Sequence, residues 1–152
     1  MIARIRKYFD TRLRADGAAG DDQERRLRLA SAALLIEVAR ADYEVRPDEM
    51  AVISRAVRRH FGLSAAETVE LIQLAEEAAD EATSYRQFTA LINANYSKAQ
   101  KLQLLEMLWE VVYADAEMEK HEEHLVRKLA DLLYVPHSQY IAAKLRVAER
   151  RG

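Results

Sequence analysis

Carboxylate side chains gather in two short segments of the chain. The first segment holds Asp42, Glu44 and Glu49, and the second holds Asp115, Glu117, Glu119 and Glu122. Carboxylate oxygens are the ligands that calcium, magnesium and manganese prefer, whereas zinc favours nitrogen and sulfur. A bound cation would relieve the repulsion among the carboxylates, so the denser second segment is the better candidate. The sequence therefore predicts oxygen-ligated divalent cations, in loops shorter than the 12-residue EF-hand loop.

A second interpretation of the same residues needs no metal. Glu49 and Glu122 stand near the third position of a predicted helix, where a carboxylate can accept hydrogen bonds from free backbone N–H groups. Asp42 and Asp115 could close the preceding turn. This interpretation gives the intervening glutamates no role, and the residue types alone leave both interpretations open.

Catalytic patterns are absent from the sequence. There is no cysteine, no His-Glu-x-x-His pair, no glycine-rich phosphate loop and no Gly-x-Ser-x-Gly. His121 and His124 share one helical face, but the internal repeat described below has Asp48 and Ala51 at those positions, which favours surface histidines. We therefore expect a protein that is not an enzyme.

The elements that carry these segments are predicted to be helices. Apolar residues recur with the helical period, no long stretch alternates with period two, and only two prolines and four glycines interrupt the chain. The pattern predicts an all-α domain of seven helices near 25–41, 47–60, 65–81, 85–95, 98–114, 120–133 and 137–149. Aromatic residues at helical spacing are expected in the core or at its edge: Tyr85, Tyr96, Trp109, Tyr113 and Tyr134.

Local signals mark where several of these helices begin. A serine followed three residues later by Glu or Gln is typical of a capping box, and a proline suits the first helical position. The capping-box pairs are Ser64 with Glu67, Ser84 with Gln87, and Ser97 with Gln100, and the prolines are Pro47 and Pro136.

An internal repeat relates the two acidic segments. A shift of 73 positions lays residues 35–44 over 108–117, Glu49 over Glu122, and 61–63 over 134–136. The apolar matches are expected of any two helices that pack in the same way. The acidic matches are not, so they indicate that both segments share a structural or chemical role. The repeat predicts two helix-loop-helix units related by a pseudo-twofold axis, and hence two similar sites.

Charge and hydropathy divide the chain and exclude some partners. Residues 1–24 are expected to be an amphipathic helix followed by a flexible linker, and residues 25–152 a helical domain. The net charge of -2 does not indicate nucleic-acid binding. No apolar run approaches the roughly 20 residues that a membrane-spanning helix needs, and no signal peptide is evident. A cytoplasmic protein is expected.

The acidic segments and their flanks resemble the tellurite resistance protein TerB family, particularly its short bacterial members. The resemblance runs from about residue 27 to 148, and its matching segments are LLIEVARAD at 34–42, RQFTALIN at 86–93, LWEVVYAD at 108–115, and EEHL at 122–125 through LLYVPH at 132–137.

The resemblance implies a compact two-repeat helical fold with an Ala-Asp-Gly-Glu type metal-binding loop in each repeat. Asp42 with Glu44, and Asp115 with Glu117, fall on that pattern, while Tyr43 and Ala116 replace its glycine. It also implies a link to stress or tellurite resistance and protein partners that are often membrane-associated. The alternative function is a metal-free scaffold whose acidic loops contact a protein partner directly.

Overall fold

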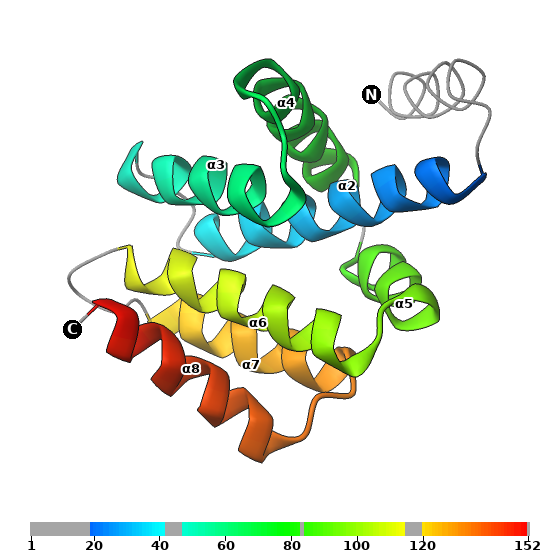
Figure 1. The fold of residues 1–152 in the computed structure, drawn as a ribbon. Helices are drawn as coiled ribbons and strands as arrows, with labels where there is room; N and C mark the ends of the chain where they lie inside the picture. Colours follow the sequence, from blue (N-terminus) through cyan, green and yellow to red (C-terminus); the bar gives the residue numbers. More distant parts are fainter. Residues whose placement is uncertain (1–18, 42–46, 83, 115–119, 152) are drawn as a thin grey trace.

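The computed structural model describes residues 19–41, 47–82, 84–114 and 120–151. In this part of the chain every regular element is an α-helix, which confirms the all-α prediction. The seven helices, shown in Figure 1, are α2 (Ala19–Ala39), α3 (Pro47–Phe61), α4 (Ala65–Glu81), α5 (Arg86–Asn95), α6 (Lys98–Tyr113), α7 (Lys120–Leu132) and α8 (His137–Arg151).

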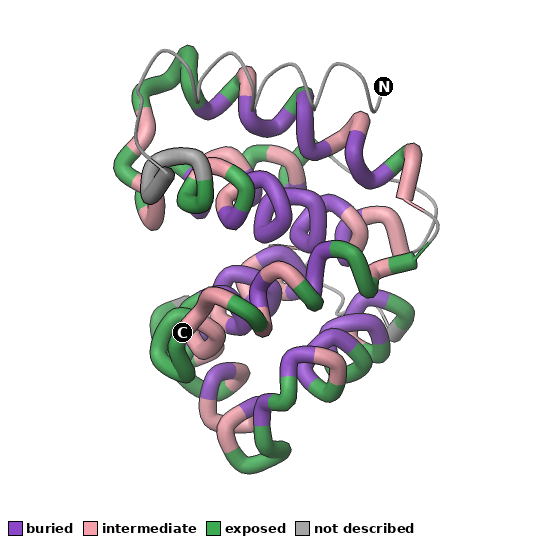
Figure 2. The backbone as a smooth tube through the Cα atoms, turned by 90° about the vertical axis from the view of Figure 1, so that its right-hand side faces the viewer, coloured by how far each residue is buried: buried purple, intermediate pink, exposed green. Residues whose placement is uncertain are grey.

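Two helices, α2 and α6, form the centre of the core. Their buried residues do not keep to one stripe: Leu34, Leu35 and Ile36 of α2 are all fully buried, as are Leu108 and Trp109 of α6. In Figure 2 the buried stretches of the tube lie mostly toward the middle of the domain and the exposed stretches toward its outside. A helix whose buried residues lie on several sides must be covered there by other helices, and the remaining helices cover this pair.

The packing of the helices is that of two repeats related by a pseudo-twofold axis. Helices α2, α3 and α4 pack against one another, and α6, α7 and α8 do the same in the same order. The repeats meet where α2 packs on α6, and the two cross contacts, α3 with α6 and α7 with α2, are the pair that a twofold axis exchanges. Helix α5 joins the repeats and contacts α2 and α7.

The first described helix begins earlier than the sequence predicts. Helix α2 starts at Ala19 rather than near residue 25, so residues 19–24, expected in the linker, are helical. The ion pair between Glu24 and Arg28, at 2.8 Å and one turn apart, stabilises this first part of the helix. The predicted amphipathic helix lies outside the described residues.

Two of the three predicted capping boxes are confirmed. In α4 and α6 the hydroxyl of Ser64 or Ser97 accepts a hydrogen bond from the third helical N–H, and the side chain of that third residue accepts one from the serine N–H. The box at Ser84 is wrong. Helix α5 begins at Arg86 behind a Tyr85 with helical backbone angles, so Ser84 Oγ accepts only the Arg86 N–H, at 3.3 Å.

Helices α3 and α7 end in the same turn. At each end one residue has positive φ, Gly62 (64°) or Tyr134 (59°). The N–H of the next residue then donates back to a carbonyl five residues earlier, from Leu63 to Arg58 at 3.1 Å and from Val135 to Ala130 at 2.9 Å.

Gly62 is therefore equivalent to Tyr134, so the predicted match of 61–63 with 134–136 is out of register by one residue. The predictions for the two prolines have different outcomes. Pro47 opens α3 as predicted, but Pro136 stands one residue before α8, where its carbonyl accepts hydrogen bonds from Gln139 and Tyr140.

Within the described ranges, no helix is both long enough and apolar enough to cross a membrane.

Candidate metal site

Two of the predicted metal ligands, Glu49 and Glu122, are buried side chains. Their exposed fractions are 0% and 1%. Each is the third residue of its helix, Glu49 in α3 and Glu122 in α7. Glutamate is seldom fully buried unless it is paired with another group. The other five predicted ligands lie outside the described residues: Asp42, Glu44, Asp115, Glu117 and Glu119.

The helix ends that carry these glutamates lie on one side of the molecule. In Figure 1 the C-terminal ends of α2 and α6 and the N-terminal ends of α3 and α7 all point to the left. Helix α2 packs against α3, α6 against α7, and α2 against α6. The first turns that hold Glu49 and Glu122 therefore belong to the same side of the two-repeat domain.

Local sequence explains why a carboxylate is tolerated at these positions. Pro47 begins α3 without an N–H to satisfy, and Asp48 Oδ1 accepts a hydrogen bond from the Glu49 N–H at 3.1 Å. Both first turns are acidic, with Asp48 and Glu49 in α3 and Glu122 and Glu123 in α7. The positive end of each helix dipole favours these charges, as it would in either interpretation of the acidic segments.

No complete ion site is formed by the described residues alone. In residues 19–41, 47–82, 84–114 and 120–151, no three His, Asp or Glu side chains come together in a way that could hold a metal ion. His121 and His124 are exposed, as expected for surface histidines. A complete site at either helix end therefore requires the acidic loops, and the seven-residue ligand set stays a prediction.

The glutamates that precede the two loops occupy different environments. Glu37 of α2 is half-buried, and its desolvation raises the pKa of its carboxyl, an effect that Arg40 opposes and Asp80 reinforces. Arg40 is itself paired with Asp80 at 2.6 Å. The equivalent of Glu37 in α6 is Glu110. The Glu110 side chain is 15% exposed and accepts hydrogen bonds from two arginines, Arg59 and Arg150.

A polar cavity of about 340 Å³ lies between α2, α6 and the ends of α3 and α5. Its wall includes the fully buried Ser31, whose Oγ lies 3.1 Å from the hydroxyl of Tyr96. The Arg28 guanidinium lies 5.9 Å from the centre of the Phe61 ring. His60 also lines the cavity, and burial lowers the pKa of its imidazole. The contact between Ser31 and Tyr96 thus links α2 to the end of α5.

The sequence reasoning missed the ion pairs between α3, α6 and α8. Glu106 and Glu110 lie one turn apart on α6, and three arginines from the neighbouring helices bind them: Arg59, Arg146 and Arg150. The available signal was the four-residue spacing of Glu106 with Glu110 and of Arg146 with Arg150, which places each pair on one helical face.

The chain was compared with known families, proteins and structures. A family model described as tellurite resistance protein TerB matches residues 28–145. No curated protein and no solved structure matches the chain. The match spans α3 to α7 entirely and most of α2 and α8.

Proposed function

The chain belongs to the tellurite resistance protein TerB family, and on that basis we propose that it is a non-catalytic module that binds divalent cations. The ion is calcium, magnesium or manganese, because the predicted ligands are carboxylate oxygens. Its site in each repeat combines the loop acids, Asp42 and Glu44 or Asp115, Glu117 and Glu119, with the helix glutamate, Glu49 or Glu122.

The equivalence of Glu49 and Glu122 is the observation that carries this proposal. Both carboxylates are buried at the third position of a helix, and both helices follow an acidic loop on the same side of the domain. Removing a carboxylate from water is costly unless a positive charge or hydrogen-bond donors compensate. A cation between this carboxylate and the loop acids would place a positive charge next to several negative ones, once in each repeat.

The decisive experiment is a cation titration of the protein after treatment with a chelator. Calcium, magnesium and manganese are added separately, and binding is followed by calorimetry and by the melting temperature. An ion that binds only the folded chain raises the melting temperature, with a gain of about 2.7 kcal/mol at one hundred times its dissociation constant. We expect Asp115→Asn with Glu117→Gln to abolish the response of the second repeat.

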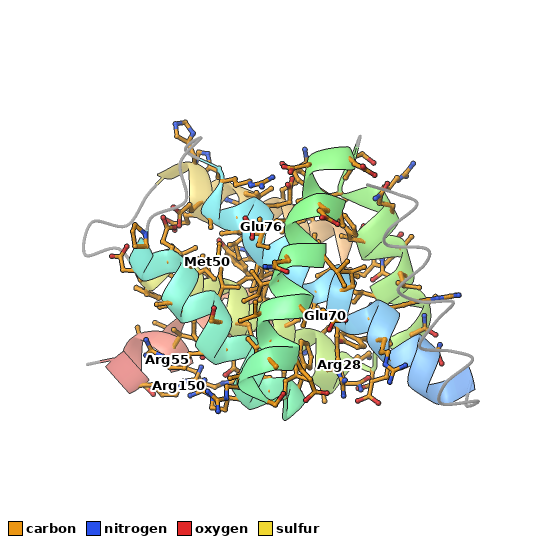
Figure 3. All side chains as sticks on the ribbon, turned by 90° about the horizontal axis from the view of Figure 1, so that it is seen from above. Arg28, Met50, Arg55, Glu70, Glu76 and Arg150 are labelled. Carbon is orange, nitrogen blue, oxygen red and sulfur yellow. The ribbon has the colours of Figure 1, made fainter. Side chains whose placement is uncertain are left out.

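A matched control separates site loss from general loss of negative charge. Glu76, labelled in Figure 3, lies on α4, a helix that holds none of the predicted ligands, so Glu76→Gln should leave the cation response intact. If no cation at millimolar concentration raises the melting temperature of the unaltered protein, the metal proposal is wrong. The acidic loops would then act as a metal-free surface for a protein partner.

The biological role proposed for the module follows from its family. We place it in a tellurite or general stress response, acting in the cytoplasm with a protein partner that can be membrane-associated. Complementation of a strain lacking the gene tests this, with survival on tellurite as the readout. The double loop variant should fail to complement while it still accumulates as folded protein.

A further inference from the structure

A second candidate site is formed by residues of α3, α6 and α8 and includes none of the predicted metal ligands. Helices α3 and α8 each pack on α6, and between them is a hollow of about 240 Å³. We call it the arginine hollow. It is lined by Val52, Arg55, Ala56, Arg59, Glu110, Val147 and Arg150. In Figure 3, Arg55 of α3 and Arg150 of α8 lie next to each other across it.

Two carboxylates of α6 fix the arginines of this face. Glu110 accepts from Arg59 at 3.1 Å and from Arg150 at 3.4 Å. Glu106 accepts from Arg150 at 3.0 Å and from Arg146 at 2.9 Å. The carboxylates are only 14% and 15% exposed, whereas the three arginine side chains are 50% to 61% exposed. The two carboxylates thus hold the guanidinium groups in place, while much of each arginine side chain remains exposed to solvent.

Donors and positive charge remain in excess after these ion pairs are made. A guanidinium has five N–H donors in a fixed planar arrangement, and each of these arginines uses only some of them on the carboxylates. The lining contains three arginines and one glutamate, which leaves a net charge of +2. Arg55 is exposed and makes no ion pair with any residue that the structure describes.

We propose that the arginine hollow binds the phosphate group of a small phosphomonoester. Guanidinium groups recognise phosphate through paired, charge-assisted hydrogen bonds, and a phosphate dianion would neutralise the surplus charge of the lining. The aliphatic side chains of Val52, Ala56 and Val147 give the organic part of the ester an apolar surface. The hollow is smaller than typical drug-sized pockets of roughly 300 Å³ or more, which suits a compact ligand.

This site is independent of the cation proposed at the loops. It takes an anion, it is built from described residues of α3, α6 and α8, and none of the seven predicted metal ligands lines it. The ion pairs of Glu106 and Glu110 could exist only to hold the helices together. Arg55 distinguishes the two roles, because it lines the hollow without taking part in that network.

The test titrates the full chain with phenyl phosphate and, separately, with inorganic phosphate, at constant ionic strength and in the presence of a chelator. Binding is followed by calorimetry and by backbone amide chemical shifts. We expect amides of α3 and α8 to shift, and the ester to bind more tightly than the free anion. Arg55→Gln removes charge-assisted hydrogen bonds to the phosphate, so it should weaken binding by roughly tenfold or more.

Arg58→Gln is the matched control, because it removes the same charge from an exposed position of the same helix outside the hollow. Both variants should melt like the unaltered protein. Equal weakening by the two variants would mean general attraction of anions and would overturn the proposal. So would failure of both probes to bind, or binding to phosphatidate vesicles without binding to the soluble ester.

Discussion

Glu49 and Glu122 occupy the same third position of α3 and α7, 73 residues apart, and the structure buries both carboxylates on one side of the domain. Their surroundings also repeat, because each helix begins with an acidic first turn directly after an acidic segment. Both repeats thus place a carboxylate at a buried position, where a charge is energetically unfavourable.

The first prediction concerns these two glutamates. In the presence of a chelator, Glu49→Gln and Glu122→Gln should each lower the free energy of unfolding by about 0.3–1 kcal/mol, because each removes a charge that the helix dipole favours. With a bound cation the loss should be larger. Urea denaturation with and without the cation measures both values. A loss that is the same with and without cation would show that the glutamates only cap their helices.

The second prediction uses the two positive-φ residues. A side chain at positive φ costs roughly 1–2 kcal/mol. A Cβ at Gly62 would meet no atom within 4 Å, so Gly62→Ala should destabilise the protein by about that amount through backbone strain alone. Tyr134→Gly should do the reverse and stabilise it. The gain should be smaller, because the Tyr134 ring lies 5.8 Å from Lys101 Nζ. Thermal denaturation of both variants tests the pair.

The third prediction concerns the helix caps. Ser64→Ala and Ser97→Ala should each cost about 1 kcal/mol, since each removes the acceptor of a complete capping box. Ser84→Ala should cost less, because Ser84 accepts a single N–H at 3.3 Å in front of a helix whose N-cap is another residue. Chemical denaturation of the three variants ranks them, and equal losses would contradict the assigned caps.

The fourth prediction is a dependence on pH from Glu37. Burial raises the pKa of this carboxyl in the folded chain above its usual value, so the folded state holds the proton more tightly than the unfolded state. The contribution to stability is present below about pH 4.5 and is lost as the pH rises through the folded-state pKa. Glu37→Gln should therefore raise the melting temperature at pH 7 and change it little at pH 4. A lower melting temperature at pH 7 would show that the pair of Arg40 and Asp80 needs the charge.

The fifth prediction is a dependence of opposite sign from His60. Burial, the largest cause, lowers the pKa of its imidazole in the folded chain. Arg59 and Arg150 lower it further, and Glu106 and Glu110 oppose the shift. The contribution to stability is present above about pH 6.5 and is lost as the pH falls through the folded-state pKa. His60→Gln should flatten the fall in melting temperature below pH 6.5, and an unchanged pH profile would contradict this.

Local signals in the sequence were enough to predict most of the helices. The capping boxes at Ser64 and Ser97 and the proline at Pro47 mark helix starts that the structure confirms, because each signal acts within one turn. The start of α2 was predicted wrongly. Residues 19–24 were expected in the linker, yet the Glu24–Arg28 pair, one turn apart, favours an earlier helix.

Burial was predicted correctly for four of the five aromatic residues that were expected in the core or at its edge. Trp109 is fully buried, and Tyr85, Tyr96 and Tyr113 are half-buried, as their helical spacing indicated. Tyr134 is 79% exposed. It has left-handed backbone angles after the end of α7, so the helical period no longer sets the direction of its side chain.

The candidate site was only partly predictable for a different reason. The repeat identified Glu49 and Glu122 as equivalent because the 73-residue shift is visible in the sequence. The arginine hollow was not predicted because Arg55, Glu110 and Arg150 lie on three helices far apart in the chain. Only the packing of α3 and α8 on α6 brings them together.

The contact between α2 and α6 has a consequence for assembly. Each repeat alone would leave the flank of its central helix without a neighbour, and that flank is the surface that the other repeat now covers. A polypeptide holding one repeat would therefore expose an apolar patch. Two copies could bury it by forming a symmetric homodimer, the arrangement that the present chain achieves within a single molecule.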